Sequence, residues 1–260
     1  MSTAFETFQA SLPIGVATAD GTILKDVVLK QPSGRMRRDL AKEPNATDAL
    51  IQALSHCVAK LGSIIDPGRE LLLQLVEEDL HYLSLLLFAE LHASPKIEIS
   101  IQCGTCGDPI ETFVDVASIG VMEIEDALEP EVTYEGAFIS GRAEIGSDIV
   151  ELKVKLRSLR DLKEIQGKVR REDPSEMELL YLMLLSQVHT IDGKSLTMDE
   201  LYDLPIAEFD SVAPAVAEML EKVNGIDKEI IVGCDSCQAH NSTVLDRDAW
   251  LRPILPRRLK

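Results

Sequence analysis

The chain has 260 residues, of which 45% are hydrophobic and 4% aromatic, with a formal net charge of −18 and a sequence pI near 4.7. Its length allows a substantial buried core, either as one large domain or as two small ones. The strong negative charge repels a phosphate backbone and therefore argues against nucleic acid as the main partner.

The first half of the sequence predicts an arm, a strand, two helices and a hairpin, in that order. Residues 1–20 are small and polar, and we expect them to become ordered only against a partner. A strand is expected at 27–30, just before a turn signal. A helix capped by Asn45 or Thr47 should follow, and a second, Leu-rich helix should run from about 70 to 91.

The second half predicts a similar order of elements. Residues 117–146 are acidic and irregular, and should form a connection that holds one or two short strands. Thr197 and Glu200 have the spacing of a helix-capping box. The expected strands are 132–134, 137–139 and 149–156, and the expected helices are 176–188 and 206–223.

The two halves look like repeats of one unit. The first C-x-x-C pair, Cys103 and Cys106, recurs 131 positions later. At that offset, without a gap, residues 79–115 contain eight identities in 37 aligned positions, against roughly two expected by chance. Upstream, the helix stops at Asp66 and Asp192 are 126 positions apart, so that part aligns only with gaps. Similarity at a fixed offset indicates duplicated units.

Each C-x-x-C pair lies between two apolar, β-branched stretches, which is the pattern of a β-hairpin with two thiols at its tip. Two such tips supply four thiolates, the number that a tetrahedral structural zinc requires. Gly104 and Gly107 let the first knuckle bend tightly. We therefore predict one structural Cys₄ zinc, which joins the two halves and has no open position for catalysis. Its predicted ligands are Cys103, Cys106, Cys234 and Cys237.

Two other interpretations of the cysteine pairs stay open, a redox-active C-x-x-C motif and thiols without a ligand. The sequence shows no N-terminal signal pattern and no apolar run long enough to span a bilayer, so we expect a cytoplasmic protein with reduced thiols and no membrane span. A redox motif normally opens a helix in a βαβ unit, whereas both pairs here lie between strand-like runs. Structural zinc is therefore favoured over both alternatives.

The other residues of chemical interest have simple interpretations. Cys57 lies on the apolar face of a helix and is expected in the core. His240 is either a substitute metal ligand or an ordinary surface histidine, and the latter is favoured. The acidic run at 77–79 is either a metal-binding or acid–base cluster or a solvated helix face, and the latter is again favoured. The sequence predicts neither an enzyme nor a small-molecule substrate.

Two basic stretches stand out in this acidic chain. One follows the first strand, and the other is a proline-containing C-terminal tail. Such a tail either extends toward a negatively charged partner or serves only for solubility, and the first is favoured. The predicted docking residues are Arg35, Arg37, Arg38, Arg252, Arg257, Arg258 and Lys260.

Several motifs, taken together and in order, resemble a known family. They are Leu-Pro-x-Gly at 12–15, Val-x-Leu-Lys at 27–30, Glu-x-Asp-x-x-x-Leu at 77–83 and Ile-x-Ile-x-x-x-Cys-x-x-Cys-Gly at 97–107. This order resembles the baseplate hub assembly family of T-even-type contractile phage tails, which has relatives in contractile injection systems. The resemblance covers most of residues 10–120. One departure is Gln238, which stands where the first knuckle has Gly107.

The resemblance implies a non-enzymatic structural or chaperone-like assembly protein of a phage tail baseplate or a related injection particle. Its partners would be hub, wedge or tube subunits. It would act in the host cytoplasm during assembly and could remain in the virion tail. The alternative is a zinc-ribbon adaptor in transcription or RNA processing, although neither hairpin carries the basic or aromatic face that such an adaptor needs.

The predicted fold is α+β, built by internal duplication from two related units that meet at the Cys₄ zinc site. Each unit is a helix pair followed by a zinc-knuckle β-hairpin. The predicted divisions are an N-terminal arm at 1–20, a first repeat unit at 21–120, an acidic linker at 121–147, a second repeat unit at 148–250 and a basic C-terminal tail at 251–260.

Overall fold

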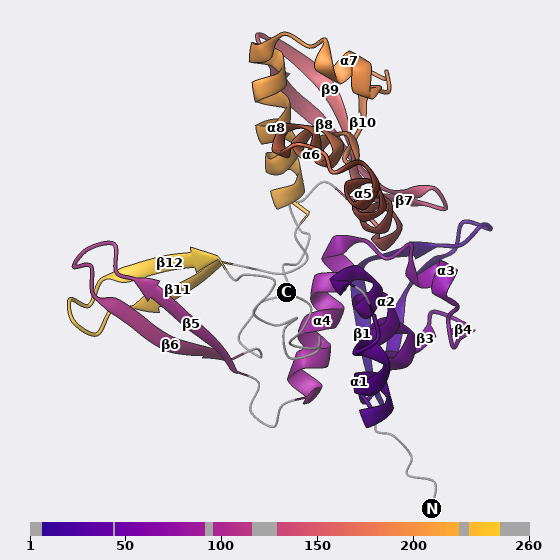
Figure 1. Cartoon of the computed structure of the whole chain (residues 1–260), viewed down its shortest axis with the longest axis vertical. Coiled ribbons are helices and arrows are strands. Elements are labelled where there is room, and N and C mark those ends of the chain that lie inside the picture. The colour runs from indigo at the N-terminus through magenta and orange to yellow at the C-terminus, as the bar shows by residue number, and fades with distance from the viewer. Residues whose placement is uncertain (1–6, 44, 92–95, 116–128, 224–228, 245–260) are drawn as a thin grey trace, which may run out of the picture.

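The computed structural model describes residues 7–43, 45–91, 96–115, 129–223 and 229–244, and the structural statements below concern these residues. The fold is mixed α+β with four small antiparallel sheets, which confirms the predicted class (Figure 1). Two sheets have four strands each, and two are two-stranded hairpins. Among the described residues, no helix has the length and apolarity needed to cross a membrane.

The first half combines a four-stranded sheet with four helices. Its strands pair in the order β1-β2-β3-β4. Asn45 caps the longer of the first two helices by accepting a hydrogen bond from the N–H of Asp48, as one of the two predicted caps. The elements are β1 (Thr7–Ala17), β2 (Ile23–Lys30), α1 (Gly34–Leu40), α2 (Ala46–Cys57), β3 (Val58–Leu61), β4 (Ile64–Ile65), α3 (Arg69–Leu72) and α4 (Glu77–Leu91).

The second half has a similar plan, with strands in the order β10-β9-β8-β7 and α8 packed on β8 and β9. The predicted capping box of Thr197 and Glu200 is confirmed at the start of α7. The elements are β7 (Glu131–Thr133), β8 (Gly136–Ile145), β9 (Asp148–Leu156), α5 (Leu159–Glu172), α6 (Glu176–Leu185), β10 (Val188–Ile191), α7 (Met198–Tyr202) and α8 (Ile206–Glu221).

Two hairpins, one from each half, lie side by side and apart from both larger sheets (Figure 1, left). The first follows α4 in the chain and the second follows α8. Segments from opposite halves of the chain therefore meet in one small module. The hairpins are β5 (Lys96–Gln102) with β6 (Pro109–Asp115), and β11 (Glu229–Gly233) with β12 (His240–Val244).

Each half inserts an apolar residue into the core of the other. Leu159 from the start of α5 is fully buried in the first core, and Ile14 of β1 is 1% exposed in the second. Burying a leucine or isoleucine side chain contributes about 1.5–3 kcal/mol. The two halves are therefore interlocked as well as covalently connected.

The connection between α3 and α4 differs from the continuous helix expected over 70–91. Its backbone turns to the other half, where the carbonyls of Leu73 and Leu75 accept from the N–H groups of Arg160 and Leu159, each at 2.9 Å. At the start of α4, the carboxylate of Glu77 forms an ion pair with the guanidinium of Arg157 at 2.8 Å. The helix breaks because these carbonyls bond across the junction instead of within a helix.

Asp79 corrects the expectation of a solvated acidic face. Its side chain is 0% exposed, and its two carboxylate oxygens accept hydrogen bonds from the N–H groups of Ile14 and Gly15, each at 2.9 Å. Burial raises the pKa of Asp79 to about 6, although the two N–H donors lower it. This contact ties the Leu-Pro-x-Gly motif to the Glu-x-Asp motif.

The expected arm and linker also differ from the structure. Residues 7–17 form β1, which pairs with β2 along most of its length, so this part of the arm is a structural strand. In the expected linker, the two predicted strands are confirmed as β7 at 131–133 and β8 at 136–145, but β8 is longer than expected and both strands belong to the second sheet. Both segments contribute buried side chains to the cores, such as Leu12 and Val16 of β1 and Ala137 and Ile139 of β8, so tertiary packing orders them.

The halves share details that sequence alignment did not reveal. A register shift separates the pairs Val58↔Leu29 and Lys60↔Val28, and another separates Val188↔Val154 and Thr190↔Lys153. After these strands, Gly62 donates its N–H to Asp26 at 2.7 Å, and Asp192 donates to Glu151 at 2.8 Å. Both donors have left-handed φ, 57° and 48°. In its turn, Gly62 rather than Asp66 therefore occupies the position that Asp192 occupies in the turn of the second half.

Candidate metal centre

The two hairpins pack against each other through their apolar faces. Alternation along β5 and β6 places Ile101 and Ile110 on one face, and alternation along β11 places Ile230 and Val232 on the facing side. These residues form one cluster with the sulfur-bearing residues Cys103 and Cys234. Packing of the β-branched strands thus brings the two tips together.

The same backbone turn builds each cysteine knuckle. In the first, the N–H of Cys103 donates to the carbonyl of Asp108, and the N–H of Gly107 donates to the carbonyl of Cys103, both at 2.9 Å. The second repeats this pattern: Cys234 donates to Ala239 at 2.9 Å and Gln238 donates to Cys234 at 2.8 Å. The two turns are equivalent in spite of their different sequences.

Gln238 has the same left-handed backbone conformation as Gly107, the glycine that it replaces in the second knuckle. Gly107 has a φ of 79°, and Gln238 has a φ of 60°, so both lie in the left-handed region. A side chain other than glycine is strained there. The Gln238 amide donates from Nε2 to the carbonyl of Asp235 at 3.0 Å, which offsets part of that strain.

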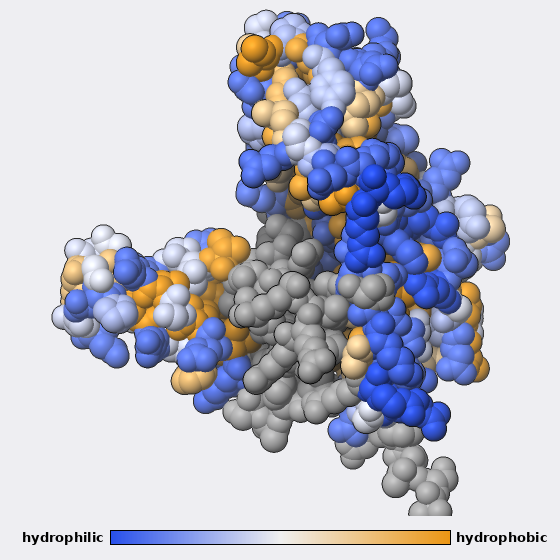
Figure 2. Space-filling view, in the orientation of Figure 1, coloured by the Kyte–Doolittle hydropathy of each residue, from blue (hydrophilic) through white to orange (hydrophobic). Residues whose placement is uncertain are grey.

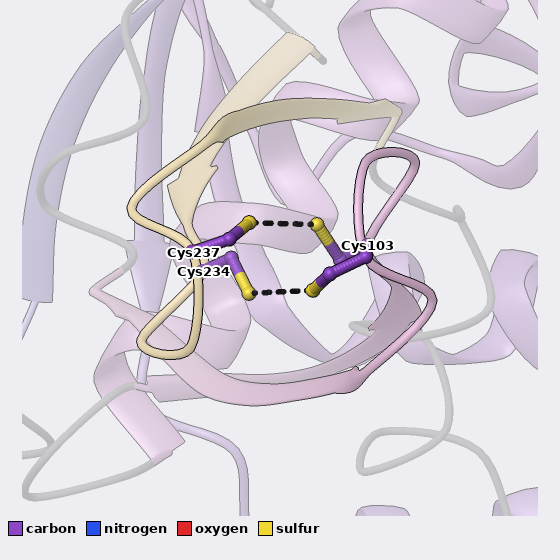
Figure 3. A group of neighbouring side chains, drawn as sticks. Cys103, Cys234 and Cys237 are labelled. Carbon is purple, nitrogen blue, oxygen red and sulfur yellow. Dashed lines mark hydrogen bonds between the residues drawn. The ribbon is translucent and has the colours of Figure 1, made fainter.

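The four predicted cysteines come together at the hairpin tips, with all their sulfur atoms within 4.8 Å of one another. Cys103 Sγ lies 3.6 Å from Cys237 Sγ, and Cys106 Sγ lies 3.7 Å from Cys234 Sγ. Figure 3 shows that Cys103 faces Cys234 and Cys237 of the other hairpin. Tetrahedral zinc with Zn–S bonds of about 2.3 Å places its sulfurs roughly 3.8 Å apart. The four sulfurs therefore have the spacing of a Cys₄ metal site, and all five cysteines of the chain are free thiols.

Backbone dipoles and the crowding of sulfurs set the protonation of the thiols. The N–H groups of Cys106 and Thr105 lower the pKa of Cys103 to about 6. The N–H of Asp108 lowers the pKa of Cys106, but burial and the neighbouring sulfurs raise it to about 12. A thiolate thus disfavours ionisation of the neighbouring thiols. A divalent cation bound between the sulfurs would offset this repulsion.

Asn241 joins the two knuckles and was not predicted from the sequence. Its Oδ1 atom accepts a hydrogen bond from the N–H of Gly104 at 2.9 Å, so β12 holds the opposite hairpin tip. Its Nδ2 atom donates to the carbonyl of Ala239 at 3.1 Å, which fixes the side chain. A single asparagine four positions after a cysteine carries no recognisable signal, since its partner lies on a distant strand.

The other candidate residues lie elsewhere. His240 is exposed and lies outside the group of metal-ligating side chains, as expected for a surface histidine. Cys57 is fully buried in the first core, where burial raises its pKa to about 12, which confirms the core interpretation. Arg35 and Arg38 are exposed on α1. The side chain of Arg37 and the four tail residues Arg252, Arg257, Arg258 and Lys260 lie outside the described part of the chain.

Comparison with known proteins places the fold and the cysteine cluster in a family. The sequence model of the T4 bacteriophage base plate protein family matches residues 18–248, a span that includes both cysteine pairs, the second four-stranded sheet and all of the first except β1. This chain belongs to that family. The resemblance inferred from the short motifs is therefore confirmed for a phage base plate family. No curated protein and no solved structure matches the chain.

Base plate membership gives the cysteine cluster its context. Base plate proteins are structural parts of the phage tail, and the family is generally non-enzymatic. A closed set of four thiolates fits such a protein because it fixes a shape and offers no open position to a substrate.

Proposed function

We propose that this base plate protein is a non-enzymatic structural or assembly component of a contractile phage tail, with its two halves fastened by one structural zinc. The observation that carries the proposal is the family match over residues 18–248. It favours a tail protein over a zinc-ribbon adaptor. The same role is proposed if the chain belongs to a related contractile injection particle instead of a phage tail.

The proposed zinc would be held by the four thiolates of Cys103, Cys106, Cys234 and Cys237. Sulfur spacing near that of a tetrahedral site and N–H donors aimed at the Cys103 sulfur support it. Zinc binding contributes about 10–16 kcal/mol in zinc-finger peptides, which exceeds the stability of many whole domains. Such an ion would therefore decide whether the two hairpins stay docked.

Internal duplication is the proposed origin of the two halves. Matching register shifts, matching donors at Gly62 and Asp192, and equivalent knuckle turns support it. The N-caps support it too: Ser33 accepts from the N–H of Met36 at the start of α1, and Ser158 accepts from that of Asp161 at the start of α5. Each half would be one sheet, its helices and one knuckle hairpin, held together across the zinc.

The proposed partners are other tail subunits, met first in the host cytoplasm during assembly. The arginines of α1 and the basic tail at 251–260 would dock on acidic surfaces of those subunits. Arg35 supports this role, because it is exposed and no ion pair of its side chain is found among the described residues.

Assembly in the presence of the other tail proteins tests the proposal. We expect a tagged chain to co-sediment with baseplate particles and to contain one zinc. The Cys103→Ser/Cys234→Ser variant should lose both the zinc and the particle, whereas the Cys57→Ala variant should keep both. A zinc-free chain that assembles normally, or a chain that never joins the particle, would contradict the proposal.

A further inference from the structure

Helix α6 exposes apolar side chains that a surface helix normally buries. Only Leu184 of its ten residues is buried, whereas Met177 and Leu180 are 57% and 46% exposed. A helix that is apolar on most sides belongs in a core or against a partner. Apolar residues reach the surface at α6, beside the strongly hydrophilic surface of α5 (Figure 2).

The exposed apolar area continues from α6 onto its neighbours. The ring of Tyr181 on α6 contacts the rings of Tyr202 and Phe209, each with centroids 4.5 Å apart. Tyr202, at the end of α7, is 45% exposed, and Ile206, at the start of α8, is 80% exposed. We call this area the α6 surface, defined by Met177, Leu180, Tyr202 and Ile206. Contiguous exposed apolar areas of this kind mark interaction sites.

The counterpart of this surface in the first half is covered. Helix α2 begins like α6: Asn45 accepts from the N–H of Asp48, and Ser175 accepts from that of Glu178. In contrast to α6, five apolar residues of α2 are fully buried, and Leu50 is partly buried. The α2 side chains with 0% exposure are Ala49, Ile51, Ala53, Leu54 and Cys57.

The start of α5, from the other half, covers the apolar side of α2. Leu159 is buried in the first core, and Leu162 packs against the same core. Beside them, Lys163 pairs with Asp48 of α2 at 3.3 Å, and Arg160 pairs with Glu70 of α3 at 3.0 Å. The covering helix thus presents two leucines three positions apart, each followed by a basic residue.

We infer that the α6 surface binds a helix of the same chemistry from a partner subunit. Acidic residues stand at corresponding helix starts in the two halves: α6 has Glu178 where α2 has Asp48, and α7 begins with Asp199 and Glu200 as α3 begins with Glu70. The partner helix would carry leucines three positions apart with Lys or Arg beside each. The inference rests on the proposed role in an assembly and on the correspondence of the two halves.

A second copy of the chain does not supply this helix. In each chain α5 is already in use, since Leu159 is fully buried and its N–H is bonded to Leu75. The partner is therefore a different tail subunit with an exposed amphipathic helix. The sequence of α5 itself serves as the probe for that chemistry.

A labelled peptide with the sequence of residues 158–172, titrated against the full chain by fluorescence anisotropy, tests the inference. We expect saturable binding that the Leu180→Glu substitution weakens by about tenfold or more, because a charge enters the apolar contact. The matched control is Ile65→Glu, since Ile65 is 74% exposed on β4 of the other half. A peptide with both leucines replaced by serine should not bind.

A charge exchange gives a second readout, in which recovery of binding by a matched peptide separates the charge contact from any change at the start of α6. The Glu178→Lys substitution should weaken binding of the wild-type peptide. A peptide with glutamate in place of Arg160 and Lys163 should regain affinity for that variant. The inference fails if the peptide does not bind, if Leu180→Glu leaves binding unchanged, or if the chain dimerises through α6. Such a failure with normal incorporation into the particle would overturn only this surface, not the proposed function.

Discussion

Asn241 Oδ1 lies 2.9 Å from the amide nitrogen of Gly104, a residue 137 positions earlier in the chain. This bond crosses between the two hairpin tips, next to the sulfurs of Cys103 and Cys237. It orients the first knuckle toward the second without touching a metal position. Hydrogen bonds of this kind around a metal site usually hold its ligands in place.

The Asn241→Ala variant should bind zinc about tenfold or more weakly, because loss of a supporting hydrogen bond typically lowers metal affinity 10–100-fold. Competition with a chromogenic chelator measures the change. The control is His240→Ala in the neighbouring exposed position. Equal zinc affinity in the Asn241→Ala variant and the wild type would show that the bond does not support the site.

Gln238 gives a test of backbone strain in the second knuckle. With a φ of 60°, it should accept glycine readily, and Gln238→Gly should keep the zinc affinity within about threefold, since relief of strain offsets the lost side-chain bond. Gln238→Val should weaken it strongly, because a β-branched residue is an outlier in this region. The same chelator competition measures both variants, and a valine variant that binds like the glycine variant would contradict the assigned conformation.

The raised pKa of Asp79 should make the free energy of unfolding depend on pH in an unusual direction. Its pKa is about 6 in the folded protein against 3.8 for an ordinary aspartate, so the folded state binds the proton more tightly. Its contribution to stability is therefore complete below pH 3.8 and is lost as pH rises through 6. The Asp79→Asn variant lacks this dependence.

Chemical unfolding of the wild type and of Asp79→Asn between about pH 4 and pH 7 measures this dependence. The free energy of unfolding of the wild type, relative to that of the variant, should fall by roughly 3 kcal/mol as the pH rises. Asp79→Ala, which leaves the N–H groups of Ile14 and Gly15 unpaired, should lower the free energy of unfolding by about 2–4 kcal/mol at pH 4 and by less at pH 7. Parallel pH curves for the wild type and Asp79→Asn would refute the raised pKa.

The Arg157–Glu77 ion pair at the junction is largely buried, with side chains 14% and 12% exposed. Removing one partner leaves the other charge without its main partner, so Arg157→Met alone should lower the free energy of unfolding by about 3 kcal/mol. The double variant Arg157→Met/Glu77→Leu should recover most of this loss. Urea denaturation of the two single variants and the double variant gives the coupling, and additive losses would show that the pair does not act as a unit.

The cysteine cluster was predictable because its signal is local. Each pair lies in a short hairpin, and a C-x-x-C between β-branched runs defines both the turn and the ligand type. That the two tips meet followed from counting ligands. The support from Asn241 and the left-handed Gln238 was not predictable, because both depend on partners that only the folded chain brings near.

Periodicity also predicted α2, β9 and the capping box of Thr197. It failed where tertiary contacts override local preference. The helix predicted over 70–91 breaks at residues 73–76 because their backbone bonds to the other half. Asp79 looked like part of a solvated face, since the two N–H groups that donate to it come from a strand 64 and 65 positions away.

We propose that four thiolates hold one zinc between the two halves. X-ray absorption at the zinc edge of the purified protein tests it most directly. We expect one zinc per chain with four sulfur neighbours at about 2.3 Å and no nitrogen or oxygen neighbour. A spectrum with oxygen or nitrogen ligands, or a native protein that contains no zinc, would contradict it.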